Sequence, residues 1–351
     1  MRIGAQMEHK ERFLAYFEGD VPDRTPLFLR DFTLGLDNLG CRTTDLIGER
    51  YDCALASESV VSFGRKTGQD AIVGCVHTPA FIIEQFGGKM KVPEYGVPLP
   101  ITHPLSSPEA LDRADASLKG KALDAIQSYH ITRKNCRDLA ILGNITGPLT
   151  KASVLMGMDV LSLAIESDPD FVKGVIDIGM EATHSFMEAI RDDVDAFFIA
   201  SASDNPSLFG TYIVNDLSVH YVKELSDFIH GLGKPSIYHP HGDYTSKELM
   251  DPVVSTGIDC FQFAEANDHC VICKLIDDRC IVMGGTNIVP TLYSGTEKDI
   301  VDETNKFLNA CSNRRYIFSC SCSLQRGVPM ESIRIMCDTV TNHIGTLRMT
   351  V

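Results

Sequence analysis

The chain lacks the features that mark export, membrane insertion or binding to polyanions. No apolar stretch approaches the roughly 18 residues of a membrane-spanning helix, and the first residues contain no apolar core of a signal peptide. Positive charge is scarce, with 32 Lys and Arg against 47 Asp and Glu and a formal net charge of −15. Nucleic acids and anionic membranes attract clustered Lys and Arg. We therefore expect a cytoplasmic protein that binds neither nucleic acid nor a membrane.

Tryptophan, low-complexity segments and charge blocks are also absent, but cysteine is plentiful. Twelve cysteines in a small secreted domain would indicate disulfides. In a chain of 351 residues without a secretion signal they are expected to be reduced thiols, a few of which are available as ligands. The length suits two average domains or one large α/β barrel.

Short β-rich runs alternate with longer amphipathic segments along nearly the whole chain. This alternation is typical of repeated βα units around a parallel sheet. Helix-start signals separate the runs, as at Asp168-Pro169 and at Thr296. We predict a single α/β domain over residues 1–351, a (β/α)8 TIM barrel with an N-terminal helical extension around residues 8–18; an open doubly wound sheet is the alternative. The expected strands are residues 27–29, 71–73, 139–142, 196–199, 236–238, 260–263, 281–283 and 316–318.

One segment departs from the alternation after the second expected strand. Residues 81–83 and 89–92, separated by two glycines, have the pattern of a hairpin. The proline-rich residues 93–104 follow them. We therefore expect residues 75–105 to form an excursion near the mouth of the barrel.

Two histidines follow the fifth expected strand and suggest half of a metal site. The tripeptide His239-Pro240-His241 comes directly after the apolar run at residues 235–238. Barrel enzymes build their active sites where strands end and βα loops begin. Two imidazoles one residue apart at such a place are able to converge on one cation. The competing interpretation is that both histidines are hydrogen-bonded loop residues.

Two cysteines follow the eighth expected strand and suggest the other half. Cys320-Ser321-Cys322 comes after the run at residues 316–319. Two His and one Cys leave the fourth tetrahedral position open, which is typical of catalytic rather than structural zinc. Because fifth and eighth strands are not neighbours in a barrel, the cysteine loop must cross the mouth, and Gly327 favours such a turn. The competing interpretation is that both cysteines are small core residues.

Other polar residues at the expected strand ends are weaker candidates. Asp204 and His77 are the candidate catalytic residues, for proton handling and for contact with substrate. Asn287 and Gly285 belong to a Gly-Gly-Thr-Asn segment whose position suits binding of a cofactor phosphate. Each competes with an ordinary role as a loop residue. Similar positions are held by Arg30, Asn144 and Glu265.

Cys270 and Cys273 have the C-x-x-C spacing of a redox dithiol or of half a zinc finger. The chain contains no second such pair, and apolar neighbours recur around these cysteines at helical spacing. We therefore expect both to be buried thiols on a helix. Cys260 and Cys280 fall in expected strands and are predicted to be core residues.

Several short motifs follow one another in a distinctive order along nearly the whole chain. They are residues 10–14 (KERFL), 19–26 (GDVPDRTP), 147–150 (GPLT) with 155–157 (LMG), 239–242 (HPHG), and 322–324 (CSL) with 328–331 (VPME). Their order and spacing resemble the uroporphyrinogen decarboxylase superfamily, and within it the methylcobamide:coenzyme M methyltransferase branch. The HPHG segment stands where those methyltransferases carry His-x-Cys-Gly. The resemblance implies the (β/α)8 barrel.

Two departures from the family pattern bear on the function that the resemblance implies. Decarboxylases of the superfamily carry Arg-Gln-Ala-Gly-Arg after the first strand to hold porphyrin carboxylates, whereas residues 30–34 lack the second arginine. A polycarboxylate would be poorly neutralised there, so we rank methyl transfer above decarboxylation. His241 replaces the middle cysteine of the methyltransferases. One thiolate and two neutral imidazoles leave Zn²⁺ about one charge unit more positive than a two-thiolate site does.

The resemblance thus implies a zinc-dependent enzyme that moves a methyl group between a corrinoid (methylcobamide) and a small acceptor or donor held at the zinc. It implies Cys322 rather than Cys320 as the ligand beside His239 and His241, because Cys322 is in register with the family's Cys-x-Leu segment. The chain has no corrinoid-binding Asp-x-His-x-x-Gly motif, so we expect the cobamide on a separate corrinoid protein or as free cofactor. A cofactor-free decarboxylase and a non-catalytic partner of a corrinoid protein are the alternatives.

Overall fold

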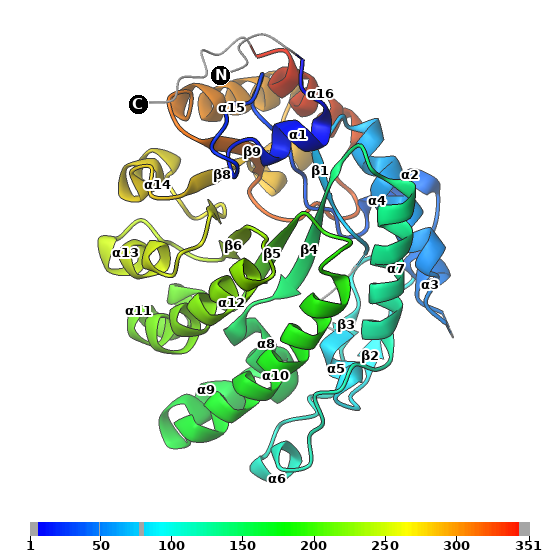
Figure 1. Ribbon diagram of the computed structural model, residues 1–351, viewed down its shortest axis with the longest axis vertical. Coiled ribbons are helices and arrows are strands. Elements are labelled where there is room, and N and C mark those ends of the chain that lie inside the picture. Colours follow the sequence, from blue (N-terminus) through cyan, green and yellow to red (C-terminus); the bar gives the residue numbers. More distant parts are fainter. Residues whose placement is uncertain (1–5, 49, 77–80, 344–351) are drawn as a thin grey trace.

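Seven parallel strands form the centre of the protein, and helices surround them (Figure 1). The computed structural model describes residues 6–48, 50–76 and 81–343. Seven of the eight expected strands are confirmed, each starting within one residue of its predicted start. In their order along the curled sheet they are β1 (Ala71–Val73), β4 (Ala140–Thr146), β5 (Ala196–Ser201), β6 (Ser236–Pro240), β7 (Cys260–Gln262), β8 (Ile281–Thr286) and β9 (Tyr316–Cys320).

The segment predicted as the first strand forms isolated bridges instead of a strand. Leu27 pairs with Phe318 of β9, and Phe28 pairs with Ala71 of β1, both in parallel. The two edges of the seven-stranded sheet therefore meet the same short segment. Pro26 precedes it and has no N–H to donate, although its carbonyl accepts the Phe318 N–H at 2.8 Å. Pairing that is divided between two neighbours over so few residues does not build a longer ladder.

Local capping signals set the starts of two long outer helices. Asp168 accepts the N–H of Phe171 at the start of α10, and Thr296 forms a reciprocal capping box with Asp299 at the start of α15. Both predicted helix starts are therefore confirmed. The helices are α1 (His9–Leu14), α2 (Leu34–Leu39), α3 (Thr43–Leu46), α4 (Cys53–Lys66), α5 (Phe81–Gln85), α6 (Pro108–Leu111), α7 (Lys121–Asn135), α8 (Pro148–Met156), α9 (Met158–Ser167), α10 (Pro169–Ile190), α11 (Pro206–Val214), η1 (Asn215–Val219), α12 (His220–Gly231), α13 (Lys247–Ser255), α14 (His269–Ile276), η2 (Ile288–Tyr293), α15 (Glu297–Ala310) and α16 (Met330–Thr341).

The seven strands are buried on both faces. Every residue of the seven strands in the parallel sheet is buried, which explains why the sequences of these strands are almost continuously apolar. Inside the sheet the rings of Phe28 and Phe198 lie 5.7 Å apart. Each fully buried side chain of this size contributes about 1.5–3 kcal/mol to stability. The apolar interior thus holds the strand ends, where polar residues begin, in fixed positions.

The excursion at residues 75–105 differs from the predicted hairpin. Phe81–Gln85 forms helix α5, and the antiparallel pair is β2 (Met90–Lys91) with β3 (Leu99–Pro100). A short apolar run is compatible with either structure. Here the helix is favoured because Phe81 and Ile83 are buried and the Gln85 side-chain amide donates to the carbonyl of Ala116.

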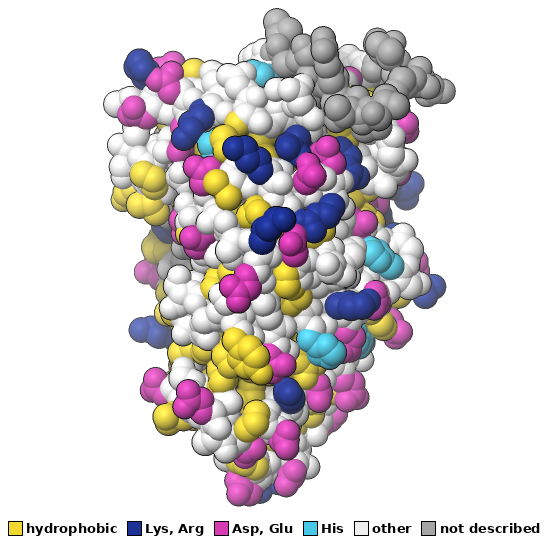
Figure 2. All heavy atoms as spheres, turned by 90° about the vertical axis from the view of Figure 1, so that its left-hand side faces the viewer, with side chains coloured by type: hydrophobic (Ala, Val, Ile, Leu, Met, Phe, Trp, Pro, Cys, Tyr) yellow, Lys and Arg dark blue, Asp and Glu magenta, His cyan; other side chains and the backbone are white. Residues whose placement is uncertain are grey.

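The acidic surplus is not spread evenly over the surface. On the face shown in Figure 2, Lys and Arg side chains gather in the upper half among acidic neighbours, and acidic side chains predominate at the lower end.

Among the described residues, no single helix has both the length and the apolarity to cross a membrane. Within the described part of the chain, α8 and α9 pass that test only as a pair, and they meet at a bend of 110°.

Candidate metal centre

His239 and His241 lie at the end of β6 on the same side of the strand. Successive strand residues point to opposite faces, so residues two apart share one face, and their rings are 5.0 Å apart. The pairing of β6 with β5 continues to the end of this segment, because the N–H of His241 donates to the carbonyl of Ser201. The His239 ring lies 5.8 Å from that of Phe198. Both histidines thus face the interior of the curled sheet.

The loop after β9 brings Cys322 to these histidines. The Cys322 Sγ lies 3.4 Å from His241 Nε2, and the three side chains place their ligand atoms within 4.8 Å of one another. The loop crosses from β9 because the Leu324 N–H donates to the Arg30 carbonyl at 2.7 Å. Gly327 has φ +94°, a conformation that favours glycine. The structure therefore brings together the three residues predicted as metal ligands.

Cys320 has different surroundings from Cys322. It is the last residue of β9 and fully buried, and its Sγ lies 3.9 Å from the Sδ of Met336 in α16. Burial raises the pKa of its thiol well above the ordinary value. Cys320 is thus a core thiol of the sheet–helix interface.

The ionisation of the three side chains favours a thiolate at Cys322. Burial on its own raises the pKa of this thiol, but the two adjacent imidazoles, His239 first and then His241, together outweigh burial and hold the pKa well below the ordinary value. The hydrogen bond with the Cys322 sulfur raises the pKa of His241. Burial lowers the pKa of His239. Metal ions bind thiolate and neutral imidazole, so the shifts at Cys322 and His239 favour binding, whereas a cation has to displace the proton that the raised pKa favours on His241.

Gln262 of β7 orients His239. Its backbone carbonyl lies 3.2 Å from His239 Nδ1, which fixes the proton on that nitrogen. His239 Nε2 is then left as a buried acceptor, and it has no hydrogen-bond partner among the described residues. Leaving such an atom unpaired costs about 1–3 kcal/mol. A cation at Nε2 would satisfy it, so the residues present fit a zinc ion with two imidazoles and one thiolate.

The side chain of Gln262 is a second feature of the site, one that was not predicted. Its amide donates to Ser319 Oγ at 3.1 Å and to the Cys320 carbonyl at 3.0 Å, which connects β7 to β9. The available signal was a single amide inside the otherwise apolar run at residues 260–263. A buried amide at that place requires partners within the sheet.

Arg30 adds a buried positive charge beside the thiolate. Its guanidinium lies over the rings of Phe32 and Phe198, at 4.7 and 5.1 Å. Burial lowers its pKa to about 10, against the opposing charge of Cys322. The group therefore stays protonated at neutral pH. Its Nε has no hydrogen-bond partner among the described residues.

Asp204 lies behind the sheet, away from the histidines. Its carboxylate accepts hydrogen bonds from the hydroxyls of Ser218 and Tyr238 and from the N–H of Leu149. Tyr238 precedes His239 in β6, so their side chains point to opposite faces. Asp204 is completely buried, and burial raises its pKa. It connects three elements on the outer side of β6.

Lys151 of α8 shares these surroundings and was not singled out by the sequence. It is completely buried, and its Nζ lies 3.5 Å from the Sδ of Met180. Burial lowers its pKa to about 7, and the charge of Asp204 opposes that shift. No motif marks such a lysine in the sequence, since its burial depends on how α8 and α10 pack.

The remaining predicted site residues do not join the three ligands. The Asn287 side chain donates to Glu303 of α15 at 2.8 Å, and its backbone N–H donates to the same carboxylate. At Gly285 a Cβ atom would lie 2.2 Å from the Ser319 carbonyl oxygen, so close packing of β8 on β9 requires glycine there. His77 lies outside the described residues.

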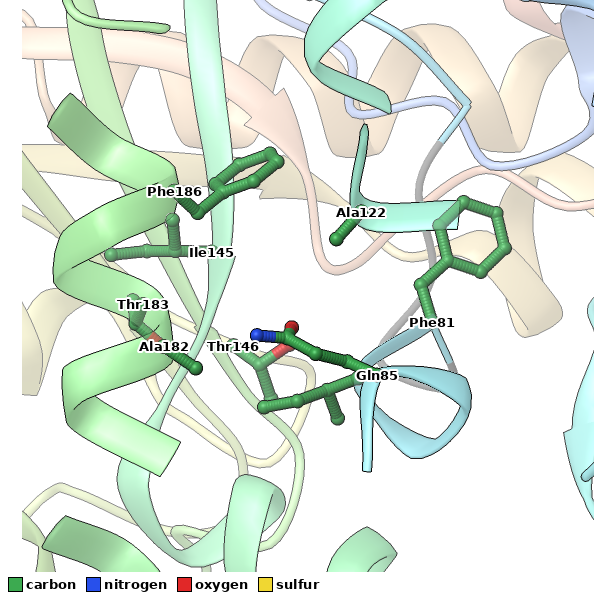
Figure 3. Close-up of a pocket in the computed structure, with 9 residues that line it drawn as sticks. Phe81, Gln85, Ala122, Ile145, Thr146, Ala182, Thr183 and Phe186 are labelled. Carbon is green, nitrogen blue, oxygen red and sulfur yellow. The ribbon is translucent and has the colours of Figure 1, made fainter. Parts of the chain in front are cut away.

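A small cavity between α5, α7, α10 and β4 is separate from this centre (Figure 3). Its volume is about 40 Å³, little more than the space of one water molecule. Its walls are mostly apolar, and the Gln85 amide extends into it. The cavity is too small for a corrinoid.

Known proteins match the chain over most of its length. The family model of uroporphyrinogen decarboxylase (URO-D) matches residues 8–343. The methylcobamide:CoM methyltransferase MtbA of Methanosarcina mazei is 21% identical over 253 residues, which is 70% of this chain and 72% of that protein. MtbA of Methanosarcina acetivorans is 21% identical over 229 residues, 64% of each chain.

Two solved structures show the same fold at low sequence identity. A methyltransferase from Methanosarcina mazei superposes with a TM-score of 0.84 at 17% identity, covering 95% of this chain and 98% of that one. A B12-independent methionine synthase from Shewanella sp. W3-18-1, in complex with selenomethionine, reaches a TM-score of 0.57 at 14% identity, covering 82% and 85%. Because the family model spans nearly the whole chain, the protein belongs to the uroporphyrinogen decarboxylase (URO-D) family.

Proposed function

We propose that the protein is a zinc-dependent methyltransferase that moves a methyl group between a corrinoid and a small acceptor or donor bound at the zinc. The observation that carries the proposal is the convergence of His239, His241 and Cys322, with the buried Nε2 of His239 free to bind a cation. The names of the two MtbA relatives support a methylcobamide as co-substrate. A separate corrinoid protein, or free cobamide, is the proposed partner.

The contacts of the chain prepare His239 and Cys322 for this role. Gln262 holds the proton of His239 on Nδ1, and the two imidazoles keep Cys322 ionised. When bound, zinc supplies a Lewis acid that deprotonates a thiol acceptor or polarises the heteroatom of a methylated donor. Arg30 holds a fixed positive charge next to the thiolate and thereby stabilises its ionised form.

His241 distinguishes this chain from the His-x-Cys-Gly pattern of the methyltransferases that it resembles. By counting ligand charges, the cation has about one more unit of positive charge than with two thiolates. A more positive cation favours oxygen ligands and the polarisation of a methylated donor. The substrate class that fits best is therefore a small methylated compound whose leaving atom is oxygen or nitrogen.

The supporting residues position this site. We propose that residues 27–28 complete an eight-stranded barrel within one domain, because they bridge both edges of the sheet. We further propose that Asp204 acts by holding Tyr238, and hence β6, in place. Asn287 and Gly285 are proposed to fix the β8 end against α15 and β9, in place of the cofactor contact first expected of them.

The test is a methyl-transfer assay with the zinc-loaded protein. Methylcob(III)alamin with a panel of thiols, and cob(I)alamin with a panel of methylated amines and ethers, should show interconversion of the two cobalamin spectra for at least one substrate. His241→Ala, which removes a ligand but not the thiol, should abolish that turnover. Porphyrinogen decarboxylation by the metal-free protein, with no methyl transfer in either direction, would replace this proposal by the decarboxylase alternative.

A further inference from the structure

A pair of buried thiols lies between α14 and the end of α15, helices that are neighbours on the outside of the sheet (Figure 1). The Sγ atoms of Cys273 and Cys311 are 3.5 Å apart, although the residues are 38 positions apart in the chain. The His269 ring packs against Phe307 with centroids 4.7 Å apart, which holds the start of α14 against α15. Sulfur atoms at this distance need only side-chain rotation and a small approach to reach bonding distance.

The two thiols differ in acidity because they share one hydrogen bond. The hydrogen bond from Cys311 lowers the pKa of Cys273, against the effect of burial. The same contact raises the pKa of Cys311. Cys273 is therefore the more acidic thiol of the pair, and the nearby charge of Arg314 also lowers its pKa.

A third cysteine connects this pair to solvent. All twelve cysteines lie in the described residues, and Cys270 alone is exposed, contrary to the prediction of a buried thiol. It is three positions before Cys273 and therefore on the same face of α14. It is also close enough to Cys311 for a negative charge on its sulfur to raise the pKa of the Cys311 thiol. The Nε2 of His269 lies 3.4 Å from the Cys270 Sγ, within hydrogen-bonding distance.

We propose that Cys273 and Cys311 form a reversible disulfide, and that Cys270 is the entry thiol through which a low-molecular-weight disulfide oxidises the pair. This site shares no residue with the three proposed zinc ligands, and the inference does not rest on the proposed function.

The exchange conserves atoms and electrons. The Cys270 thiolate attacks the disulfide RSSR, forms a mixed disulfide Cys270–SR and releases one RS⁻. The Cys273 thiolate attacks the Cys270 sulfur and releases the second RS⁻. The Cys311 thiolate then attacks the Cys273 sulfur, forms the Cys273–Cys311 bond and returns Cys270 as a thiol. Two protein thiols are oxidised, RSSR is reduced to two RSH, and the thiol protons end on the released RS⁻ groups.

The experiment treats the purified full-length protein with glutathione disulfide and maps the products by tryptic digestion and mass spectrometry. Wild type should lose two hydrogen atoms per chain, show a Cys273–Cys311 cross-link and return to the dithiol with dithiothreitol. Cys311→Ser should instead accumulate glutathione on Cys270 or a Cys270–Cys273 link. Cys270→Ser should slow the cross-link at least about tenfold because the buried pair then lacks its entry thiol. Cys280→Ser, the change of a buried cysteine outside the pair, should behave as wild type.

Two outcomes would overturn the inference. Stable glutathione on Cys270 of the wild type, without a Cys273–Cys311 link, would mean that the pair does not close. Formation of the Cys273–Cys311 link at the wild-type rate in Cys270→Ser would show that Cys270 is not the entry thiol. Circular dichroism of each variant shows whether it is folded, and mapping separates any adduct on Cys322 from these products.

Discussion

Replacing Cys322 by Ala should remove zinc and leave the fold intact, whereas replacing Cys320 by Ala should retain zinc and weaken the fold. The Cys322 Sγ faces His241 Nε2 at 3.4 Å. The Cys320 Sγ faces the Sδ of Met336 at 3.9 Å. Because the two thiols are two positions apart in sequence and the substitution is the same, each variant is the matched control of the other.

The expected magnitudes follow from what each sulfur contacts. Loss of a residue that merely orients a metal ligand lowers metal affinity about 10–100-fold, and Cys322→Ala removes the ligand itself, so a loss of at least about 100-fold is expected. Cys320→Ala deletes a fully buried sulfur and should lower the free energy of unfolding by roughly 1 kcal/mol. Cys322→Ala should change the free energy of unfolding of the metal-free protein by less than about 0.5 kcal/mol, because its thiol is partly exposed.

Zinc affinity is measured by competition with a chromogenic chelator, and stability by urea unfolding in excess chelator. Equal loss of zinc in both variants would show that the thiolate ligand is wrongly assigned. Loss of zinc in Cys320→Ala alone would refute the site, because Cys320 faces the helix and not the histidines.

Three further changes test the surroundings of the site. Asp204→Asn replaces an acceptor of three hydrogen bonds by an amide that presents a donor. The free energy of unfolding, measured in urea, should therefore fall by about 1–3 kcal/mol, while kcat of the folded enzyme changes less than about threefold. A large loss of kcat at unchanged stability would show that Asp204 is catalytic. His241→Cys should keep zinc bound and raise the number of sulfur ligands seen by zinc X-ray absorption from one to two; an unchanged sulfur count would place His241 outside the coordination sphere. Burial lowers the pKa of Lys151 to about 7 from its ordinary 10.5, so the charged form destabilises the fold fully below pH 7 and progressively less as the pH rises toward 10.5. Lys151→Met should therefore be more stable than wild type by about 1–4 kcal/mol at pH 6, and this gain should shrink by pH 10 in urea titrations; a gain independent of pH would contradict the buried-charge account.

The sequence was sufficient for seven of the eight predicted strands and for the position of the two histidines. Parallel strands buried on both faces leave apolar runs, and the two-residue period of a strand places His239 and His241 on one side once β6 is located. The choice between Cys320 and Cys322 did not follow from this period, because the chain leaves the strand between them. It came from the register of the family motif, and the loop contact of Leu324 with Arg30 explains it physically.

Other features depend on packing that no local pattern encodes. Position after a strand suggested Asp204 for the mouth, but a residue beyond the last paired position is free to turn either way, and the hydroxyls of Ser218 and Tyr238 hold it behind the sheet. The run beginning at Phe81 was too short to distinguish helix from strand. The contact of Cys273 with Cys311 joins two helices that are distant in sequence, so spacing alone did not reveal it.

The central claim is that zinc held by His239, His241 and Cys322 carries the methyl transfer. The most direct measurement is the turnover of methylcob(III)alamin or cob(I)alamin by one protein preparation before zinc removal, after removal by a chelator, and after stoichiometric zinc is returned. Metal polarisation contributes several kcal/mol to such a transition state, so turnover should fall by about two or more orders of magnitude without zinc and recover when it is restored. Unchanged turnover in the zinc-free protein would contradict the account.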